Sequence, residues 1–250
     1  MENAPGPRLG DAFGELLVAQ SRDLTTPQYE LVERDDGFLG VTDARIYFRD
    51  VAGWGPLEWQ ACEQAQGRVL DVGCGAGRHS IAMIARGLEV TGLEPSPGAA
   101  QIARSRGVSV VQRRLDQLAE TDGTFDTIVM LGNNLSLLAS PETATATLTN
   151  LAAHAAPGAI LLGQAMDPYG TKDPLHLAYH EWNRARGRPG GQLRIRVRFR
   201  GTVTDWFDYW FLTVDELAAA VESTPWALSH VEHSGPAYLA TLTRLPAIAS

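Results

Sequence analysis

Short apolar runs alternate with helical stripes of apolar residues through the middle of the chain. The run Arg68–Gly73 ends in glycine, and further runs follow at 88–93, 108–112, 125–131 and 159–166. Apolar runs of this length are typical of strands that are buried on both faces of a sheet. Helical spacing occupies the segments between them, with glycine near each end, at 76–86, 96–106 and 141–155. The pattern predicts an α/β fold with a doubly wound, mostly parallel sheet.

The two ends of the chain follow different periods. Leu9, Phe13, Leu16 and Leu17 form the apolar stripe of an N-terminal helix. Residues 192–201 alternate strictly between polar and apolar, and much of 202–212 does so as well, which predicts an antiparallel hairpin. A helix and two further strands are expected at the C-terminal end, over residues 213–222, 226–233 and 237–244.

These patterns divide the chain into a cap and one larger domain. We expect a helical cap over residues 1–60 and a main domain over residues 61–250. The hairpin belongs to an insertion at about 168–212, after the fifth strand. Of the 19 aromatic residues, only Phe125 lies between residues 61 and 165, so the main sheet differs in composition from the segments that flank it.

Composition narrows the class of protein. The chain has 250 residues, of which 44% are hydrophobic and 20% charged, as in ordinary globular domains. Cys62 and Cys74 are the two cysteines and form no C-x-x-C pair, which argues against a disulfide scaffold or a cysteine zinc site. No apolar signal region or membrane-length run is present, so we expect a cytoplasmic protein. The net charge of −8 argues against a general nucleic-acid or membrane binder, and the excess of arginine over a single lysine suggests a bacterial source.

A glycine loop and three acids carry the strongest chemical signal. Gly73, Gly75 and Gly77 lie between the first buried strand and a helix, where backbone can approach an anionic ligand. Asp71 precedes the loop, Glu94 ends the second strand, where an acid can accept both ribose hydroxyls, and Asp116 follows the third strand, where a carboxylate can accept from an adenine amino group. A dinucleotide site fits less well, because Arg78 occupies the last glycine position of its fingerprint.

In this order and spacing, the glycine loop, Glu94, Asp116 and the strand that begins Phe125-Asp126 resemble the class I S-adenosylmethionine-dependent methyltransferase family. The resemblance covers residues 68–167. It implies a Rossmann-like sheet of seven strands that ends in an antiparallel pair. It also implies S-adenosyl-L-methionine as cofactor and S-adenosyl-L-homocysteine as product.

The resemblance assigns cofactor contacts to particular residues. The loop lies under the methionine part, Glu94 holds the ribose, Asp116 reads adenine, and Arg78 either reaches the cofactor carboxylate or projects from its helix. The implied set is Asp71, Gly73, Cys74, Gly75, Gly77, Arg78, Glu94, Pro95, Leu115, Asp116, Gln117, Leu131, Gly132 and Asn133.

Residues for the acceptor side follow from chemistry and position. Methyl transfer is an in-line displacement, so the protein must align and desolvate the acceptor and need not supply a base. His176, Tyr179 and His180 share one face of an expected helix and are candidate catalytic residues; the alternative is a solvated surface helix. Aromatic and amide side chains form the candidate substrate set: Tyr29, Tyr47, Asn134, Trp206 and Tyr209. The carboxylates available there make a weak ligand set, so no metal is expected.

Seven arginines within residues 184–200 are the best argument for a nucleic-acid substrate. Four of them alternate with Leu193, Ile195, Val197 and Phe199, which favours one solvated strand face paired with Asp205 and Asp208. We therefore expect a methyltransferase that acts on an oxygen or nitrogen of a small molecule. The alternatives are an RNA or protein methyltransferase and a non-catalytic S-adenosylmethionine-binding protein, and the oligomeric state is left open.

Overall fold

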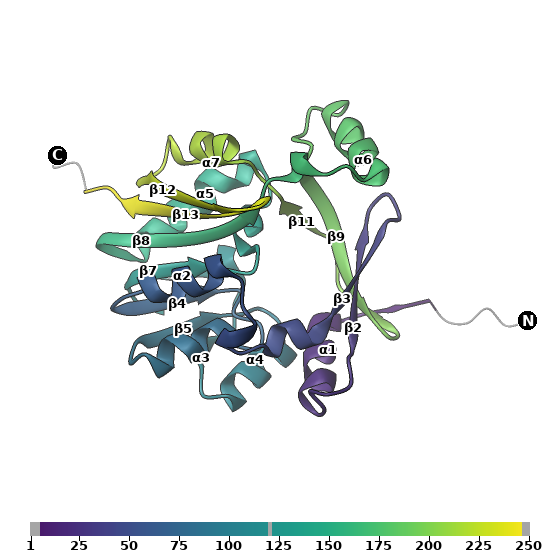
Figure 1. The fold of residues 1–250 in the computed structure, drawn as a ribbon, viewed down its shortest axis with the longest axis horizontal. Helices are drawn as coiled ribbons and strands as arrows, with labels where there is room; N and C mark the ends of the chain where they lie inside the picture. The colour runs from purple at the N-terminus through teal and green to yellow at the C-terminus, as the bar shows by residue number, and fades with distance from the viewer. Residues whose placement is uncertain (1–5, 120–121, 247–250) are drawn as a thin grey trace, which may run out of the picture.

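The computed structural model describes residues 6–119 and 122–246 and contains two sheets, of which the smaller lies beyond the strand ends of the larger (Figure 1). The larger has seven strands within these residues. In spatial order they are β12 (Trp226–Ser234), β13 (Ala237–Arg244), β8 (Ala155–Met166), β7 (Phe125–Met130), β4 (Arg68–Val72), β5 (Glu89–Leu93) and β6 (Ser109–Val111). The strands from β8 to β6 are parallel, and β12 and β13 are antiparallel. The predicted doubly wound sheet and its antiparallel ending are confirmed.

The order of the parallel strands reverses at β4, which pairs with β5 on one side and β7 on the other. Ligands of open α/β sheets bind beyond the carboxyl ends of the strands at such a point. We therefore expect a ligand to bind at the loops that follow β4, β5 and β7.

Helices cover both faces of the larger sheet. Serine side chains define the start of two of them: Ser96 accepts a hydrogen bond from Ala99 N–H at 3.1 Å and Ser140 from Thr143 N–H at 3.3 Å, each followed by proline at the first helical position. The helices around this sheet are α2 (Pro56–Gln64), α3 (Arg78–Ala85), α4 (Pro97–Ser105), α5 (Pro141–Ala153) and α7 (Val214–Val221), with the short 3-10 turns η3 (Leu115–Gln117) and η5 (Asn134–Leu138).

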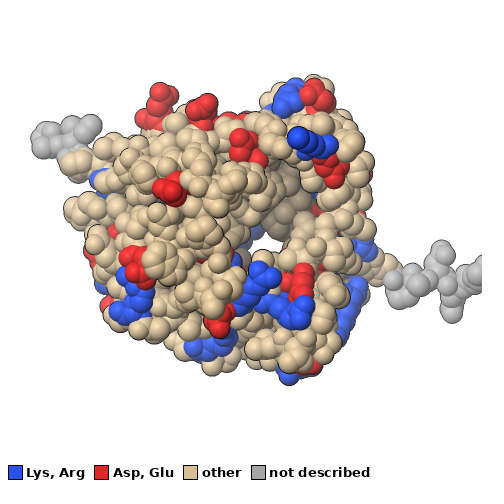
Figure 2. Space-filling model, in the orientation of Figure 1, with Lys and Arg blue, Asp and Glu red and all other residues tan. Residues whose placement is uncertain are grey.

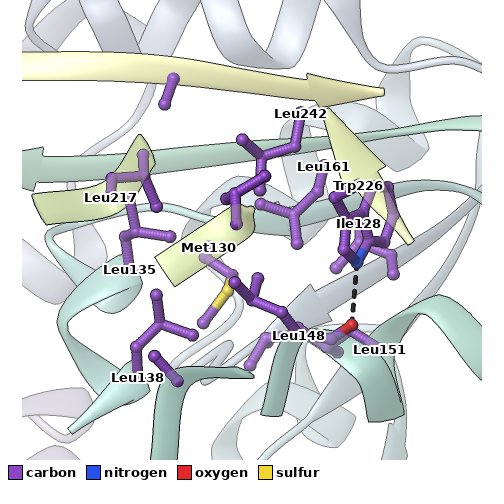
Figure 3. Close-up of a cluster of buried hydrophobic side chains, with 14 of the residues drawn as sticks. Ile128, Met130, Leu135, Leu138, Leu148, Leu151, Leu161, Leu217, Trp226 and Leu242 are labelled. Carbon is purple, nitrogen blue, oxygen red and sulfur yellow. Dashed lines mark hydrogen bonds between the residues drawn. The ribbon is translucent and has the colours of Figure 1, made fainter. Parts of the chain in front are cut away.

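The main core lies between this sheet and helices α5 and α7 (Figure 3). Ile128 and Met130 of β7 are fully buried against Leu148 of α5. Trp226 fills the end of this cluster, and its indole N–H donates to the Leu148 carbonyl at 2.8 Å. Burial of the large indole without an unpaired donor fixes β12 against α5.

The smaller sheet combines strands of the predicted cap with strands of the predicted insertion. Its path is β1 (Arg8–Leu9), β10 (Thr202–Val203), β9 (Gln192–Phe199), β2 (Tyr29–Arg34) and β3 (Leu39–Asp43), and β11 (Phe207–Trp210) also pairs with β9. The cap supplies helix α1 (Ala12–Ser21), and it also supplies β2 and β3, which no clear period indicates. Leu9 lies in β1 instead of the expected helical stripe. The remaining elements are η1 (Ala44–Phe48), η2 (Val51–Gly53), η6 (Pro168–Gly170) and α6 (Pro174–Arg184).

The two faces of the smaller sheet have different chemistry, as the alternation in residues 192–201 predicts. Ile195, Val197 and Phe199 are buried on the inner face, which is directed toward the larger sheet. On the outer face, Arg196 and Arg198 form ion pairs with Glu33 at 2.8 and 3.0 Å, and Arg194 lies 3.9 Å from Asp208. The arginine-rich strand is thus a solvated face paired with acids. No helix in the described ranges is long and apolar enough to cross a membrane.

Candidate cofactor and acceptor site

The glycine loop connects β4 to α3 in a left-handed conformation. Gly73, Gly75 and Gly77 have φ of 70°, 54° and 78°. A Cβ at Gly73 would lie 2.6 Å from Asn134 Nδ2, and one at Gly77 would lie 2.8 Å from Val108 Cγ2, so packing alone requires glycine there. Above Gly75 the nearest atom is Phe13 Cζ at 3.9 Å. The loop therefore leaves a cradle at Gly75, beside the ring of Phe13, that fits a ligand approaching the backbone.

Two buried acids hold this loop. The Asp71 carboxylate is fully buried and accepts from Ser80 Oγ at 2.6 Å, and burial raises its pKa. Glu94 directly follows β5 and accepts from the N–H groups of Gly75 and Ser96, both at 2.9 Å. Burial raises the pKa of Glu94 to about 7, against the opposing effect of these hydrogen bonds. Since each carboxylate oxygen can accept two hydrogen bonds, Glu94 keeps acceptor capacity for a diol beside the cradle.

Asp116 lies in η3 together with Leu115 and Gln117, after β6. Its carboxylate is exposed and forms a 3.0 Å ion pair with Arg114, whose hydrogen bond lowers the pKa of Asp116. Because β6 is adjacent to β5, η3 lies along the same edge of the sheet as Glu94. The structure thus brings the predicted ribose and adenine acids to neighbouring strand ends.

The loop after β7 supports the glycine loop from the other side. Asn134 donates from Nδ2 to the carbonyls of Val72 and Gly73, each at 2.9 Å. Its amide group, predicted to contact substrate, is therefore engaged with backbone. Asn133 has a φ of 68°, and its carbonyl accepts from the Tyr209 hydroxyl at 2.7 Å. This contact joins β11 of the smaller sheet to the larger one.

Arg78 and His79 meet a buried acid at the start of α3. Glu58 of α2 pairs with the Arg78 guanidinium and lies 3.0 Å from His79 Nε2. Although burial opposes it, the contacts with His79 and Arg78 lower the pKa of Glu58 to about 2. A Cβ at Gly132 would lie 3.4 Å from Arg78 Nη2, so the guanidinium lies beside the loop after β7. Cys74 is buried behind the glycine loop and contributes its backbone there.

The inner face of the smaller sheet lies opposite these loops. The space-filling view shows an opening between the two sheets (Figure 2). Tyr47 donates its hydroxyl to Glu30 Oε2 at 2.6 Å, and its ring meets the edge of Phe13 at 5.2 Å. Burial raises the pKa of Tyr47, and the charge of Glu30 adds to this effect. Tyr209 shares its face of β11 with Phe207, which packs in the same cluster as Tyr47, so the two predicted chamber residues lie on the same inner face.

The other two predicted aromatic residues lie on the opposite face. Tyr29 is 53% exposed and alternates with Glu30 along β2. Trp206 stacks against Arg196, whose guanidinium carbon is 4.4 Å from its ring. The structure separates both of them from Tyr47 and Tyr209.

Helix α6 carries the three candidate catalytic residues in three different surroundings. Tyr179 is buried and donates its hydroxyl to Asp35 at 2.6 Å, with the Arg34 guanidinium 4.0 Å above its ring. His180 is buried, burial lowers its pKa, and its Nδ1 has no partner among the described residues. The His176 ring contacts Phe38 at 5.1 Å. Figure 1 places α6 at one end of the smaller sheet, and the role of these residues stays a prediction.

Three residues at the site were not foreseen. Phe13 belongs to the apolar stripe of α1, which indicates core and does not reveal the exposed ring edge. Glu58 precedes the first strand of the larger sheet, and it belongs to no motif that indicates a site. Glu30 lies in the mixed segment Tyr29–Arg34, where both faces carry an acid, so no alternation shows which one turns inward.

Comparison with known proteins supports the family that the glycine loop and the acids resemble. Residues 69–158 match the methyltransferase domain family. The putative methyltransferase YqeM of Bacillus subtilis is 27% identical over 132 residues, which is 50% of this chain and 53% of that protein. A ubiquinone biosynthesis O-methyltransferase of Xanthomonas euvesicatoria is 41% identical over 76 residues, 28% of this chain and 32% of that protein. The matches thus span about half or less of these relatives.

A solved structure extends the likeness to the whole fold. An S-adenosylmethionine-dependent methyltransferase from Bacteroides fragilis, solved in complex with S-adenosyl-L-homocysteine, aligns with a TM-score of 0.80 over 94% of this chain and 95% of its own, at 23% identity. The domain match and the fold agree. Residues 69–158 form a methyltransferase domain, and the fold around it is that of an S-adenosylmethionine-dependent methyltransferase.

Proposed function

We propose that this protein transfers a methyl group from S-adenosyl-L-methionine to an oxygen or nitrogen atom of a small organic molecule. The observation that carries the proposal is that Phe13 lies next to the Gly75 cradle, which Glu94 holds, and also contacts Tyr47 of the smaller sheet's inner side. One side can hold a nucleoside and its methionine tail, and the other can enclose an acceptor. The name of the Xanthomonas relative, an O-methyltransferase of ubiquinone biosynthesis, supports a small acceptor.

The residues present fit the cofactor of the family. Glu94 would accept from the ribose hydroxyls, the Gly73–Gly77 backbone would lie along the methionine part, and the η3 residues would contact adenine. Arg78, beside Gly132, would face the cofactor carboxylate. When bound, the cofactor supplies an electrophilic methyl group. The protein must therefore align an acceptor and exclude water, which the two opposed sheets can do.

The proposed acceptor side carries two aromatic rings, Tyr47 of η1 and Tyr209 of β11. Tyr47 is held by Glu30 and Tyr209 by the Asn133 carbonyl, so both rings have fixed positions. Compact, partly apolar ligands suit such surroundings. The arginines of β9 lie on the outer face and pair with acids, which disfavours a nucleic-acid substrate. Catalytic roles for His176 and His180 remain proposals that alanine substitutions would test.

The test is transfer of tritiated methyl groups into fractionated bacterial extract. We expect the label in metabolites that are no larger than about the size of S-adenosyl-L-methionine. Label in RNA or in protein would contradict the small-molecule proposal and favour the corresponding alternative. Tight calorimetric binding of S-adenosyl-L-homocysteine with no transfer into any fraction would favour a non-catalytic binding protein.

A further inference from the structure

A buried carboxylate without a cation lies on the acceptor side. Glu30 is 6% exposed on the inner face of β2. Its Oε2 accepts from the Tyr47 hydroxyl, and among the described residues no other group donates to it or forms an ion pair with it. Glu33, three residues along the same strand, lies on the outer face and is held by two arginines. Glu30 therefore differs from Glu33 in lacking a compensating charge.

The surroundings of Glu30 favour a cationic ligand. The Arg78 guanidinium at the start of α3 is already paired with Glu58. Burial raises the pKa of Glu30, because a desolvated negative charge is costly without a partner. The rings of Phe13 and Tyr47 lie beside Glu30, and the face of an aromatic ring attracts an ammonium group. A ligand cation would supply the charge that Glu30 lacks and would be attracted by the aromatic rings, whereas a carboxylate or phosphate would be repelled.

We propose that Glu30, oriented by Tyr47, binds the ammonium group of a small primary or secondary amine and that nitrogen is the methyl acceptor. The proposal rests on the proposed function and specifies its substrate class. The Tyr47 hydroxyl occupies Oε2, which leaves Oε1 to accept from the ammonium N–H. Glu30 is then a substrate-binding and catalytic residue, and Tyr47 is its positioning residue.

The proton balance assigns Glu30 a second task. An ammonium nitrogen has no lone pair, so one N–H bond must break before methylation, with its electron pair left on nitrogen and its proton taken by Oε1 of Glu30. The nitrogen then forms the new bond to carbon, and the electron pair of the broken sulfur–carbon bond stays on sulfur. Glu30 returns its proton to water. The raised pKa makes Glu30 a stronger base than an exposed carboxylate.

Binding is tested first with a matched pair of probes. Protein saturated with S-adenosyl-L-homocysteine is titrated calorimetrically at pH 7 with phenethylamine and with 2-phenylethanol. We expect the amine to bind at least about tenfold more tightly and Glu30→Gln to abolish this preference. Glu33→Gln, on the outer face of the same strand, should retain it. Equal affinity for the two probes, or no detectable binding of either, would overturn the proposal.

Transfer gives the second readout. Labelled small products from the extract experiment are passed over a strong cation exchanger at pH 7. We expect the label in the retained, cationic fraction, and a loss of at least about tenfold with Glu30→Gln at unchanged affinity for S-adenosyl-L-homocysteine. Label in neutral or anionic metabolites would refute the amine proposal and leave the proposed function intact. Failure to bind the homocysteine product at all would refute the proposed function itself.

Discussion

Buried carboxylates at the site differ in how their charge is satisfied. Glu94 receives two backbone N–H groups, Asp71 receives one hydroxyl, and Glu30 receives one phenol. Burial raises the pKa of all three. Each is thus costly to the folded protein alone, and each can regain free energy from a ligand that donates hydrogen bonds or brings positive charge.

The free energy that burial of the charged Glu94 side chain costs can be measured as a pH dependence of stability. Its pKa is about 7 in the folded protein against 4.5 for an unperturbed side chain. Between these values the folded protein keeps a proton that the unfolded chain has lost. Stability is therefore highest at the acid end of this window and falls as the pH rises through 7, by at most about 3 kcal/mol from this group.

Glu94→Gln cannot ionise and should lack this decline. Urea unfolding of both proteins without cofactor, at several pH values from 5.5 to 8.5, measures the difference. Glu30 is unchanged in both proteins, so its contribution is common to the two profiles. Parallel pH profiles would show that Glu94 is not the group that titrates.

At the scale of elements, helix α1 packs against α4 through Leu17, and one residue, Asp11, supplies its hydrogen bonds to the start of α4. Asp11 accepts from Gly14 N–H at 3.0 Å at the start of α1, and from Ser96 Oγ at 2.7 Å and Gly98 N–H at 2.8 Å at the start of α4. One carboxylate therefore caps two helices. This attachment also places Phe13 above Gly75.

Asp11→Ala should lose about 2 kcal/mol of stability, because two helix starts lose a cap. Asp173→Ala is the matched control, since Asp173 caps α6 alone through Leu175 N–H at 2.8 Å, and about 1 kcal/mol is expected there. Urea unfolding gives both values. Calorimetry should in addition show about tenfold weaker binding of S-adenosyl-L-homocysteine by the Asp11 variant only. Equal losses and unchanged binding would mean that α1 does not cover the cofactor.

The elements that local pattern predicts well are those of the larger sheet. Its strands are continuous apolar runs bounded by glycine. Because the parallel strands end at the same edge of the sheet, the glycine loop and the acids that follow these strands lie along that edge. In the smaller sheet the antiparallel strands of residues 192–212 are predicted, but their pairing with the cap is not, because Val32 pairs with Val197 across most of the chain and neither segment signals the other. Register alone decides that Glu30 turns inward and Glu33 outward. Tyr179 shares the expected helix face with both histidines, yet its contact with Asp35 depends on that same pairing.

At the scale of the whole molecule, the cap and the insertion neutralise each other in one sheet. The first 60 residues are acidic and residues 184–200 are rich in arginine, and β2 lies beside β9. The net charge of −8 therefore does not describe either segment alone. The sheet that results closes over the larger one through α1 and the Tyr209–Asn133 contact. A ligand between the two sheets would bind both at once.

Binding of S-adenosyl-L-homocysteine should therefore protect the two sheets unequally from hydrogen exchange. We expect peptides from α1 and β2 to gain more protection than those from β12, because a ligand suppresses openings that separate the elements it bridges. The β12 strand lies at the far edge of the larger sheet, four strands away from β4, which leads into the glycine loop. Exchange followed by mass spectrometry, with and without ligand, measures the difference, and Glu94→Gln should reduce it at the same ligand concentration. Protection confined to the glycine loop would instead mean that the smaller sheet takes no part in holding the cofactor.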